Sequence, residues 1–428
     1  MNMTSSVANI EIKKPRAFGL KRIARRAVLS QLEKLHTGRI TIKEGDEVME
    51  FGSNKESLLS GELEILDSSA YVDILTGGSI GAAEAYMTGD WITNDLTALV
   101  KVMVRNMDVL DAMEGGVVEF VTKPFLKWFH YLNQNSAKGS RRNIAAHYDL
   151  GNDLFELFLD PTMMYSSGIF PNKQASMEEA SLTKLKTICE SLHLTEKDRV
   201  VEIGTGWGGF AIYAAKHYGC HVTTTTISEE QFKWAQEAVV REGLEDKVTL
   251  LKKDYRFLTE HGKFDKLVSI EMIEAVGAKY FDTYFSTVSD LLKPDGLALI
   301  QAITIEDQRY DNALKNVDFI QRYIFPGSCI PSIQGMLSAT KKNTDMNLVK
   351  LNDFGQDYAR TLNAWQKQFD KNEEAITKLG YSDDFKRMWR FYLSYCEGGF
   401  AERAIGVSHI VLAKPEYKHE YNHGINLQ

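Results

Sequence analysis

The sequence predicts an α/β protein whose larger part is built on a parallel β-sheet. A short apolar strand at residues 200–203 runs directly into a glycine-rich turn at residues 204–209, which opens a helix. Further apolar strands then alternate with helical stretches along the rest of the chain. Such alternation indicates βαβ units with parallel strands and right-handed crossovers.

The glycine turn is the first candidate binding element. Because Gly204, Gly206 and Gly208 carry no Cβ, backbone N–H groups and the start of the following helix can approach a ligand closely. Turns of this kind hold dinucleotides, hold S-adenosylmethionine, or only allow a helix to pack tightly on a strand. The turn alone leaves these three interpretations open.

Four more strands are expected at residues 221–226, 248–252, 266–271 and 297–303. Ser228 follows the first of them as a plausible N-cap of the next helix. A helical insertion is expected around residues 305–395, and a last strand at 406–413. Ligands of parallel sheets bind at the carboxyl ends of the strands, where the segments after these strands emerge. The strand at 221–226 ends in threonines, whereas a dinucleotide site would need an acidic residue there.

Length and composition set further limits. A chain of 428 residues, 44% of them hydrophobic, can bury a large core in two or three domains. It has no apolar run of about 18 residues and no apolar signal-peptide core, so we expect a cytoplasmic protein. Its four cysteines are too scattered for a zinc motif or a disulfide framework, and we expect no metal.

The N-terminal part is basic. Residues 1–39 contain nine basic and two acidic residues, although the whole chain has a net charge of −8. Between Leu20 and Leu35, apolar residues recur at helical spacing, and the basic residues lie mostly off that face: Lys21, Arg22, Arg25 and Arg26. This pattern is typical of a helix on an anionic membrane surface, and equally of a domain helix with a solvated basic face. Nucleic acid is disfavoured, because the remaining chain is acidic.

The chain divides into two predicted domains. Residues 1–132 contain short alternating segments at 40–42 and 63–66 and a helical stretch at 96–107, which predicts a small α+β domain. Residues 133–142 are polar and predict a linker. The α/β domain occupies residues 143–428.

Several ordered motifs resemble those of the cyclopropane-fatty-acyl-phospholipid synthases, which use S-adenosylmethionine to modify unsaturated acyl chains of membrane lipids. The resemblance covers residues 140–413 and rests on residues 147–155, 164–167, 202–209, 226–231, 254–256, 323–327 and 354–358. It implies a Rossmann-like class I methyltransferase domain with a helical insertion. The N-terminal region resembles the smaller lipid-binding domain of the longer members.

The resemblance also implies the site. The residues expected to contact S-adenosylmethionine are Tyr165, Ser166, Gly204, Thr205, Gly206, Trp207, Gly208, Thr226, Gln231, Asp254 and Tyr255. In this family a bound bicarbonate ion acts as the base. Its expected neighbours are Glu274, Ile303, Tyr358, Cys396 and the backbone of Ser167. Taken singly, Glu274 is more typical of a helix N-terminus, Tyr358 of an aromatic core and Cys396 of a buried inert thiol.

Two positions depart from the best-known bacterial pattern. Ser167 stands where a cysteine is usual, and Gln301 stands where a bicarbonate-binding histidine is usual. A glutamine amide can donate to an anion but cannot hold a proton. The segment around Gln301 resembles the plant-type branch, which includes cyclopropane formers.

Three functions are considered. The first is transfer of a methyl group from S-adenosylmethionine to an acyl double bond of a phospholipid, followed by cyclopropane closure. The second ends in a methylene- or methyl-branched acyl chain, and the third is a non-catalytic lipid-binding protein. The expected setting is the inner face of a membrane, bound peripherally to anionic phospholipid, and a homodimer would suit such an enzyme.

Overall fold

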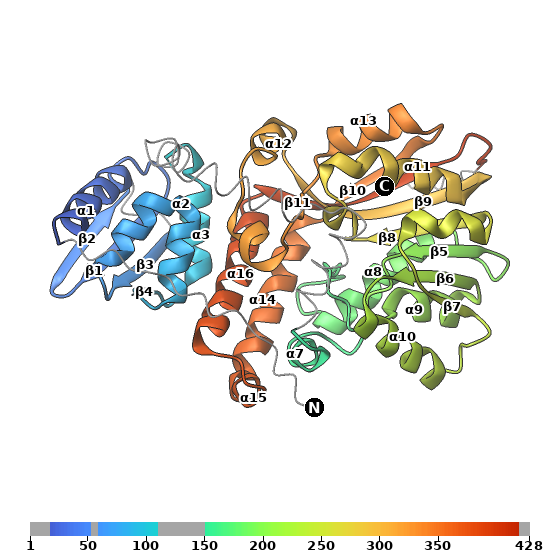
Figure 1. The fold of residues 1–428 in the computed structure, drawn as a ribbon, viewed down its shortest axis with the longest axis horizontal. Coiled ribbons are helices and arrows are strands. Elements are labelled where there is room, and N and C mark those ends of the chain that lie inside the picture. The colour runs from blue at the N-terminus through green and yellow to red at the C-terminus, as the bar shows by residue number, and fades with distance from the viewer. Residues whose placement is uncertain (1–17, 53–58, 110–149, 419–428) are drawn as a thin grey trace, which may run out of the picture. The chain divides into compact units, whose positions relative to one another are not determined.

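The computed structural model describes residues 18–52, 59–109 and 150–418. The chain forms two compact units, Met1–Thr122 and Lys123–Gln428 (Figure 1). The linker expected at 133–142 and the first residues of the motif at 147–155 lie outside the described residues.

The smaller unit is an α+β structure. Its described elements are α1 (Phe18–Leu32), β1 (Arg39–Glu44), β2 (Glu47–Phe51), β3 (Ser60–Ile65), α2 (Ser69–Met87), β4 (Trp91–Ile92) and α3 (Leu96–Val104). The strands form one sheet in the order β2-β1-β3-β4, in which β1 is antiparallel to β2 and parallel to β3. This mixed sheet with helices is the α+β arrangement that the sequence predicts.

Helix α1 belongs to the fold of this unit. Its buried apolar side chains are Ala24, Val28 and Leu32. Lys21 and Arg25 form ion pairs with acidic residues of the same unit. Leu20 and Ile23 stay exposed, at 40% and 66% of their surfaces. Most of the predicted apolar face is therefore buried within this unit, which favours the domain-helix interpretation. Two apolar side chains of α1 remain exposed to solvent.

The larger unit contains the predicted parallel sheet. Its strands are β5 (Arg199–Ile203), β6 (His221–Thr226), β7 (Val248–Lys252), β8 (Phe264–Ile270), β9 (Leu292–Ile305), β10 (Asn347–Asp353) and β11 (Ile405–Ala413). They are ordered β10-β11-β9-β8-β5-β6-β7. Strands β5 to β9 run parallel, whereas β11 is antiparallel to β9 and β10 is antiparallel to β11.

Helices cover both faces of this sheet (Figure 1). The helices are α7 (Asn152–Glu156), α8 (Met177–Ser191), α9 (Gly209–Tyr218), α10 (Glu229–Arg241), α11 (Phe281–Leu291), α12 (Asp307–Ala313), α13 (Ile333–Asn343), α14 (Gly355–Lys371), α15 (Glu373–Lys378) and α16 (Asp383–Ala401). Shorter helical turns are η1 (Tyr255–His261), η2 (Ile273–Ala275), η3 (Ala278–Tyr280) and η4 (Ile320–Ile324).

Alternate strand residues face two separate cores. Val201 and Ile203 of β5 pack in one core with residues of α11 and α13. Val200 of the same strand packs in the other core with residues of α8 and α9. The period-two alternation of β-strands thus produces a three-layer structure.

The prediction that residues 305–395 form a helical insertion is wrong for one segment. Residues Asn347–Asp353 form β10, an edge strand that pairs with β11. Every residue of β10 is exposed, so its sequence lacks the apolar alternation by which a half-buried strand is recognised. The rest of the segment is largely helical, and α14 and α16 pack side by side (Figure 1).

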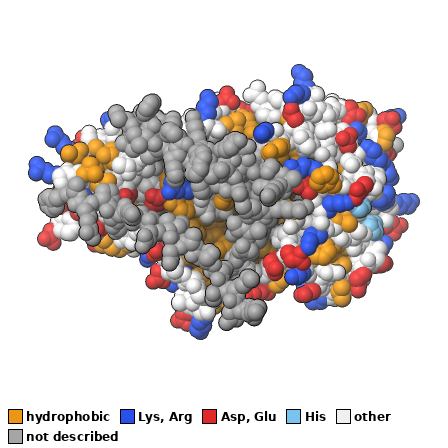
Figure 2. All heavy atoms as spheres, in the orientation of Figure 1, with side chains coloured by type: hydrophobic (Ala, Val, Ile, Leu, Met, Phe, Trp, Pro, Cys, Tyr) orange, Lys and Arg blue, Asp and Glu red, His pale blue; other side chains and the backbone are white. Residues whose placement is uncertain are grey.

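Charged side chains of both signs are interspersed on the visible face of the larger unit (Figure 2). Within the described ranges, no helix is both long and apolar enough to cross a membrane.

Candidate active site

The carboxyl ends of the parallel strands carry most of the predicted site residues. The glycine turn follows β5, Thr226 ends β6, Asp254 follows β7, and Glu274 follows β8. In a parallel sheet these ends lie along one edge, where ligands bind.

The glycine turn has the left-handed backbone that favours glycine. Gly204, Gly206 and Gly208 have φ angles of 99°, 53° and 94°. A Cβ added at Gly206 would meet no protein atom within 4 Å, so this side of the turn is open to a ligand. The amides of Gly204 and Thr205 both donate to Thr225 O, at 3.1 and 3.0 Å. These two N–H groups therefore join the turn after β5 to β6, so a cofactor would meet other groups of the turn.

The side chains of Thr205 and Trp207 support the turn from within the protein. Thr205 Oγ1 lies 2.7 Å from Thr224 Oγ1, which in turn donates to Glu202 Oε2. Trp207 is buried and donates from Nε1 to Asn152 Oδ1 at 2.8 Å. These side-chain contacts hold the turn in place, and contact of the two residues with the cofactor stays a prediction.

The next strand ends contribute polar groups. Thr226 Oγ1 donates to Gln231 Oε1 at 2.8 Å, and Ser228 caps α10 by accepting from the Gln231 amide, as predicted. Asp254 accepts two hydrogen bonds from the Arg256 side chain. Tyr255 packs edge-on against the ring of Tyr284. The structure thus brings the side chains of Thr226 and Gln231 together. The carboxylate of Asp254 is instead held by the side chain of Arg256.

An aromatic wall surrounds Tyr165. The hydroxyl of Tyr165 donates to Tyr392 Oη at 2.9 Å. The rings within 6.4 Å of the Tyr165 ring, centre to centre, are those of Phe155, Phe158, Phe325 and Trp365. Phe325 belongs to the motif at 323–327, so the fold joins two motifs that are far apart in sequence.

Ser166, next to Tyr165 in the chain, contacts a buried cation. Its Oγ accepts from Lys184 Nζ at 2.7 Å, and Lys184 is fully buried. Burial lowers the pKa of Lys184 to about 8, while the negative charges of Glu271 and Asp160 oppose this shift. The ammonium group is thus placed where it stabilises an anion at Glu271.

Glu274 lies at the predicted position beside Ile303. Its Oε1 accepts from the Ile303 amide at 2.5 Å, and its buried Oε2 has no hydrogen-bond partner among the described residues. Burial, and then the charge of Glu271, raise its pKa to about 8. At neutral pH Glu274 is therefore an uncharged acid.

Glu271 is a site residue that sequence reasoning missed. Its Oε1 accepts from the amide of Ser167 at 3.0 Å and from Gln301 Nε2 at 2.7 Å. Its Oε2 accepts from the hydroxyl of Tyr358 at 2.7 Å. The sequence places Glu271 only at the end of a strand, and nothing in its neighbours signals that its side chain turns toward these three donors.

The residues present do not fit a bicarbonate ion. Three groups expected to surround it, at Ser167, Gln301 and Tyr358, already donate to Glu271. The amide of Ile303 donates to Glu274. Cys396 is partly buried, and burial raises the pKa of its thiol, so it carries no negative charge. The carboxylate of Glu271 accepts the hydrogen bonds that the anion would need.

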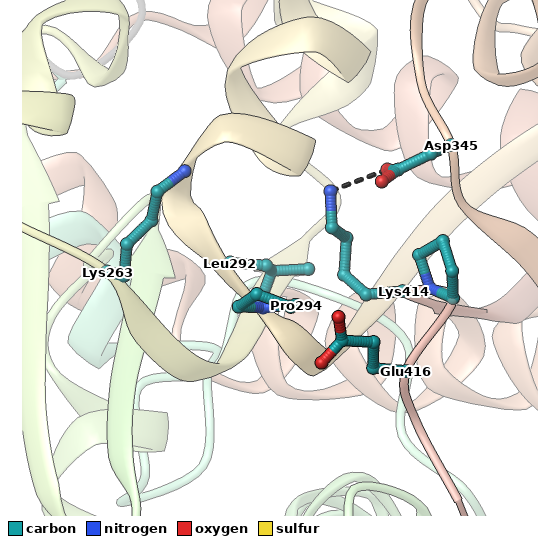
Figure 3. A pocket seen from close by; sticks show the side chains of 7 residues that line it. Lys263, Leu292, Pro294, Asp345, Lys414 and Glu416 are labelled. Carbon is teal, nitrogen blue, oxygen red and sulfur yellow. Dashed lines mark hydrogen bonds and ion pairs between the residues drawn. The ribbon is translucent and has the colours of Figure 1, made fainter.

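A surface pocket lies at the opposite edge of the sheet (Figure 3). Lys263 precedes β8, Leu292 begins β9 and Lys414 follows the antiparallel β11, so these residues mark the amino ends of the parallel strands. Lys414 forms an ion pair with Asp345 across it (Figure 3). The lining residues are Lys263, Leu292, Pro294, Asp345, Lys414, Pro415 and Glu416. This pocket is separate from the predicted site.

Known proteins are similar to this chain in sequence and in fold. The family model described as mycolic acid cyclopropane synthetase matches residues 135–410. The cyclopropane-fatty-acyl-phospholipid synthase of Escherichia coli is 37% identical over 355 residues, which cover 82% of this chain and 88% of that protein. The tuberculostearic acid methyltransferase UfaA1 of Mycobacterium tuberculosis is 36% identical over 331 residues, or 76% of each chain.

A solved structure agrees with these sequence matches. The mycolic acid cyclopropane synthase CmaA1, crystallised with SAH and CTAB, superposes with a TM-score of 0.59 at 27% identity. The match covers 64% of this chain and 98% of that one. The class I methyltransferase fold, the cofactor class and the activity on lipid acyl chains are thereby confirmed, and the non-catalytic interpretation is wrong. The chain belongs to the mycolic acid cyclopropane synthetase family of S-adenosylmethionine-dependent methyltransferases.

Proposed function

We propose that this enzyme transfers a methyl group to one carbon of the double bond in an unsaturated phospholipid acyl chain and then closes a cyclopropane ring. S-adenosylmethionine supplies the electrophilic methyl group on a sulfonium centre. Methylation of an isolated alkene leaves a positive charge on the neighbouring carbon. The site must therefore accommodate an apolar chain, tolerate a cation and accept a proton.

The observation that carries the proposal is a buried carboxylate pair beside an aromatic wall. The rings around Tyr165 offer apolar surface for an acyl chain, and aromatic faces attract cations. Tyr358 joins the two parts, because its hydroxyl donates to Glu271 and its ring packs against Trp365. A cation formed at this wall has an anionic carboxylate within the same site.

The site contains no evident side-chain nucleophile among the groups just described. Cys396 is kept as a thiol, and burial raises the pKa of Tyr358 well above its ordinary range, so its phenol stays protonated. The charge of Glu271 is shared among three hydrogen-bond donors, which weakens the attack of its oxygens on the methyl donor. These features support methylation of the lipid in preference to the protein.

A second candidate product is a methyl- or methylene-branched acyl chain. The likeness to the tuberculostearic acid methyltransferase UfaA1, at 36% identity, favours this alternative. It needs the same methyl transfer, after which the carbocation loses another proton or undergoes a hydride shift instead of closing the ring. The two outcomes diverge only after the carbocation has formed.

The smaller unit supports a role at the membrane surface. Exposed Leu20 and Ile23 lie on α1 beside exposed Arg22 and Arg26. Apolar side chains flanked by cations suit an anionic lipid surface, where the hydrocarbon enters the interface and the cations meet phosphate. We assign peripheral binding of phospholipid to this face of α1.

The experiment uses phospholipid vesicles with monounsaturated chains and S-adenosylmethionine carrying a trideuterated methyl group. A cyclopropane that resists mild hydrogenation and keeps two deuterium atoms supports ring closure. A methylene product also keeps two but is hydrogenated, and a methyl-branched alkene keeps three. Failure to form S-adenosylhomocysteine with any unsaturated lipid, while a known synthase does so, contradicts the proposal.

A further inference from the structure

We infer that Glu271 is the chain's own proton acceptor, held in the place of an external base and oriented by Gln301 and His409. The inference rests on the proposed function, because it assigns the group that closes the ring. It replaces a diffusible ion with a residue of the chain.

The hydrogen bonds of Glu271 favour its ionised form: burial raises the pKa of this carboxyl group, and its hydrogen bonds with Tyr358, Ser167 and Gln301 lower it. Its oxygens accept from an amide N–H, a side-chain amide and a phenol, so three donors converge on one side chain. Glu274 accepts one hydrogen bond and its second oxygen accepts none among the described residues. Two adjacent buried carboxyl groups avoid carrying two charges. Because three donors face Glu271 and one faces Glu274, the hydrogen bonds favour the charge on Glu271 and the proton on Glu274.

His409 fixes the orientation of the Gln301 amide. The two residues face each other across β11 and β9, with His409 Nε2 2.9 Å from Gln301 Oε1. Because burial lowers the pKa of His409 to about 3, the ring is neutral and can donate from only one nitrogen. When His409 donates to Oε1, Gln301 Nε2 must point to Glu271. The ring of Phe354 packs edge-on against His409 and limits its rotation.

The backbone at Glu271 is strained. Its φ angle is +47°, in the left-handed region that costs a residue with a Cβ free energy and that glycine adopts readily. Such strain persists where the surrounding contacts determine it, often at functional sites. Here the contacts are the hydrogen bonds that the Glu271 carboxylate accepts from Ser167, Gln301 and Tyr358.

Glu271 is also less buried than its three donors. Residue Glu271 as a whole is partly exposed, whereas Ser167 and Gln301 are fully buried and Tyr358 is 5% exposed. Glu271 is thus less enclosed than the residues that donate to it. A proton acceptor needs both a fixed position and access.

The proposed step balances. An alkene carbon forms a bond to the methyl group as the methyl–sulfur bond breaks, and S-adenosylhomocysteine leaves with the sulfur electron pair. Glu271 then takes one proton from the transferred methyl group and becomes a neutral acid. The released C–H electron pair forms the bond to the cationic carbon and closes the ring. Water receives the proton from Glu271 after product release.

The test compares the full-length wild type with Glu271→Gly and with Glu237→Gln, a control at an exposed position of α10. Glycine relieves the backbone strain, so loss of folding is not expected and is checked by thermal melting. Assays in carbon-dioxide-free buffer measure both S-adenosylhomocysteine and cyclopropane. We expect an unchanged wild-type rate, an unchanged control, and about a hundredfold or greater loss of cyclopropane in Glu271→Gly. Added formate or bicarbonate should restore part of that activity by occupying the exposed donors.

The outcomes separate the two proposals. If the wild type forms no S-adenosylhomocysteine from unsaturated lipid, the proposed function fails. If the wild type forms cyclopropane only when bicarbonate is supplied, the inference about Glu271 is overturned while the function stands. A folded Glu271→Gly variant that makes cyclopropane at the wild-type rate in carbon-dioxide-free buffer also overturns it.

Discussion

His409 and Gln301 form a cross-strand pair in which an imidazole nitrogen lies 2.9 Å from the amide oxygen. The same amide donates to Glu271 at 2.7 Å. Removing the imidazole should therefore free the amide to rotate. We predict that His409→Leu retains S-adenosylhomocysteine formation within about tenfold of wild type but shifts the product from cyclopropane toward branched alkene, since only the late proton step depends on this orientation.

The product ratio from trideuterated S-adenosylmethionine measures this shift. His409→Asn retains a side-chain donor and should recover part of the cyclopropane. An unaltered ratio in a folded His409→Leu protein would show that the pair has only a structural role.

Gly206 provides a test of the cofactor turn. Its φ angle is 53°, and a Cβ there would meet no protein atom, so Gly206→Ala should fold and yet project a methyl group toward the cofactor. We expect the Kd for S-adenosylmethionine to rise by at least about tenfold, equivalent to about 1.4 kcal/mol. Isothermal titration calorimetry measures the change.

Gly243→Ala is the matched control, because Gly243 has a φ angle of 66° and an equally open Cβ position after α10. It imposes similar backbone strain away from the site. Equal effects of both variants on the Kd would argue against contact between the turn and the cofactor.

We expect the buried carboxyl group of Glu202 to make the folding stability of the protein depend on pH. Burial raises its pKa from an ordinary value of 4.5 to about 8. Between these values the folded protein holds a proton that the unfolded chain has lost, so the contribution of Glu202 to stability is present below pH 4.5 and declines as the pH rises to 8. Glu202→Gln should flatten this decline and raise Tm at pH 8 by about 2–4 °C for each kcal/mol of penalty removed.

Melting curves from pH 5 to 8 provide the measurement, with exposed Glu237→Gln as the control. Parallel Tm profiles for wild type and Glu202→Gln would contradict the assignment. Thr224 can still donate to the amide oxygen of glutamine, so the variant keeps this hydrogen bond. The comparison therefore tests only the loss of the titratable proton.

Ile23 tests the membrane face of α1. It is 66% exposed, and an aspartate there places a negative charge beside the lipid surface without disturbing the buried face. Ile23→Asp should weaken sedimentation with anionic phospholipid vesicles several-fold, because burial of the side chain is lost and the anion is repelled.

Val48→Asp is the control, since Val48 is 61% exposed on β2 of the same unit. Equal binding of wild type and Ile23→Asp would remove α1 from the membrane contact. Both variants leave the methyltransferase unit unchanged.

The sequence predicted the architecture well, because periodic burial governs it. The bounds expected for β6 and β7 are those observed, and the alternation of the β5 residues matches the two cores. Strand β10 was missed because all its residues are exposed at the sheet edge. Pairing with β11 stabilises it, and that partner lies far along the chain.

The site was predicted less completely, because tertiary contacts decide which groups are free. The glycine turn was found, but two of its amides bind Thr225 O of the next strand. Glu274 was correctly placed beside Ile303. The left-handed backbone of Glu271 has no local sequence signal, since glutamate rarely adopts it, and its three donors come from distant segments.

The most direct test of the central claim compares Glu271→Gln with Glu274→Gln, using trideuterated S-adenosylmethionine and monounsaturated phospholipid. Because Glu274 is already uncharged at neutral pH, its glutamine variant should still form the cyclopropane with two deuterium atoms, at no less than about a tenth of the wild-type rate. Glu271→Gln should lose the ring by about a hundredfold or more, and any remaining branched alkene should keep three deuterium atoms. Cyclopropane formation at the wild-type rate by Glu271→Gln, together with its loss in Glu274→Gln, would contradict the assignment of the proton acceptor.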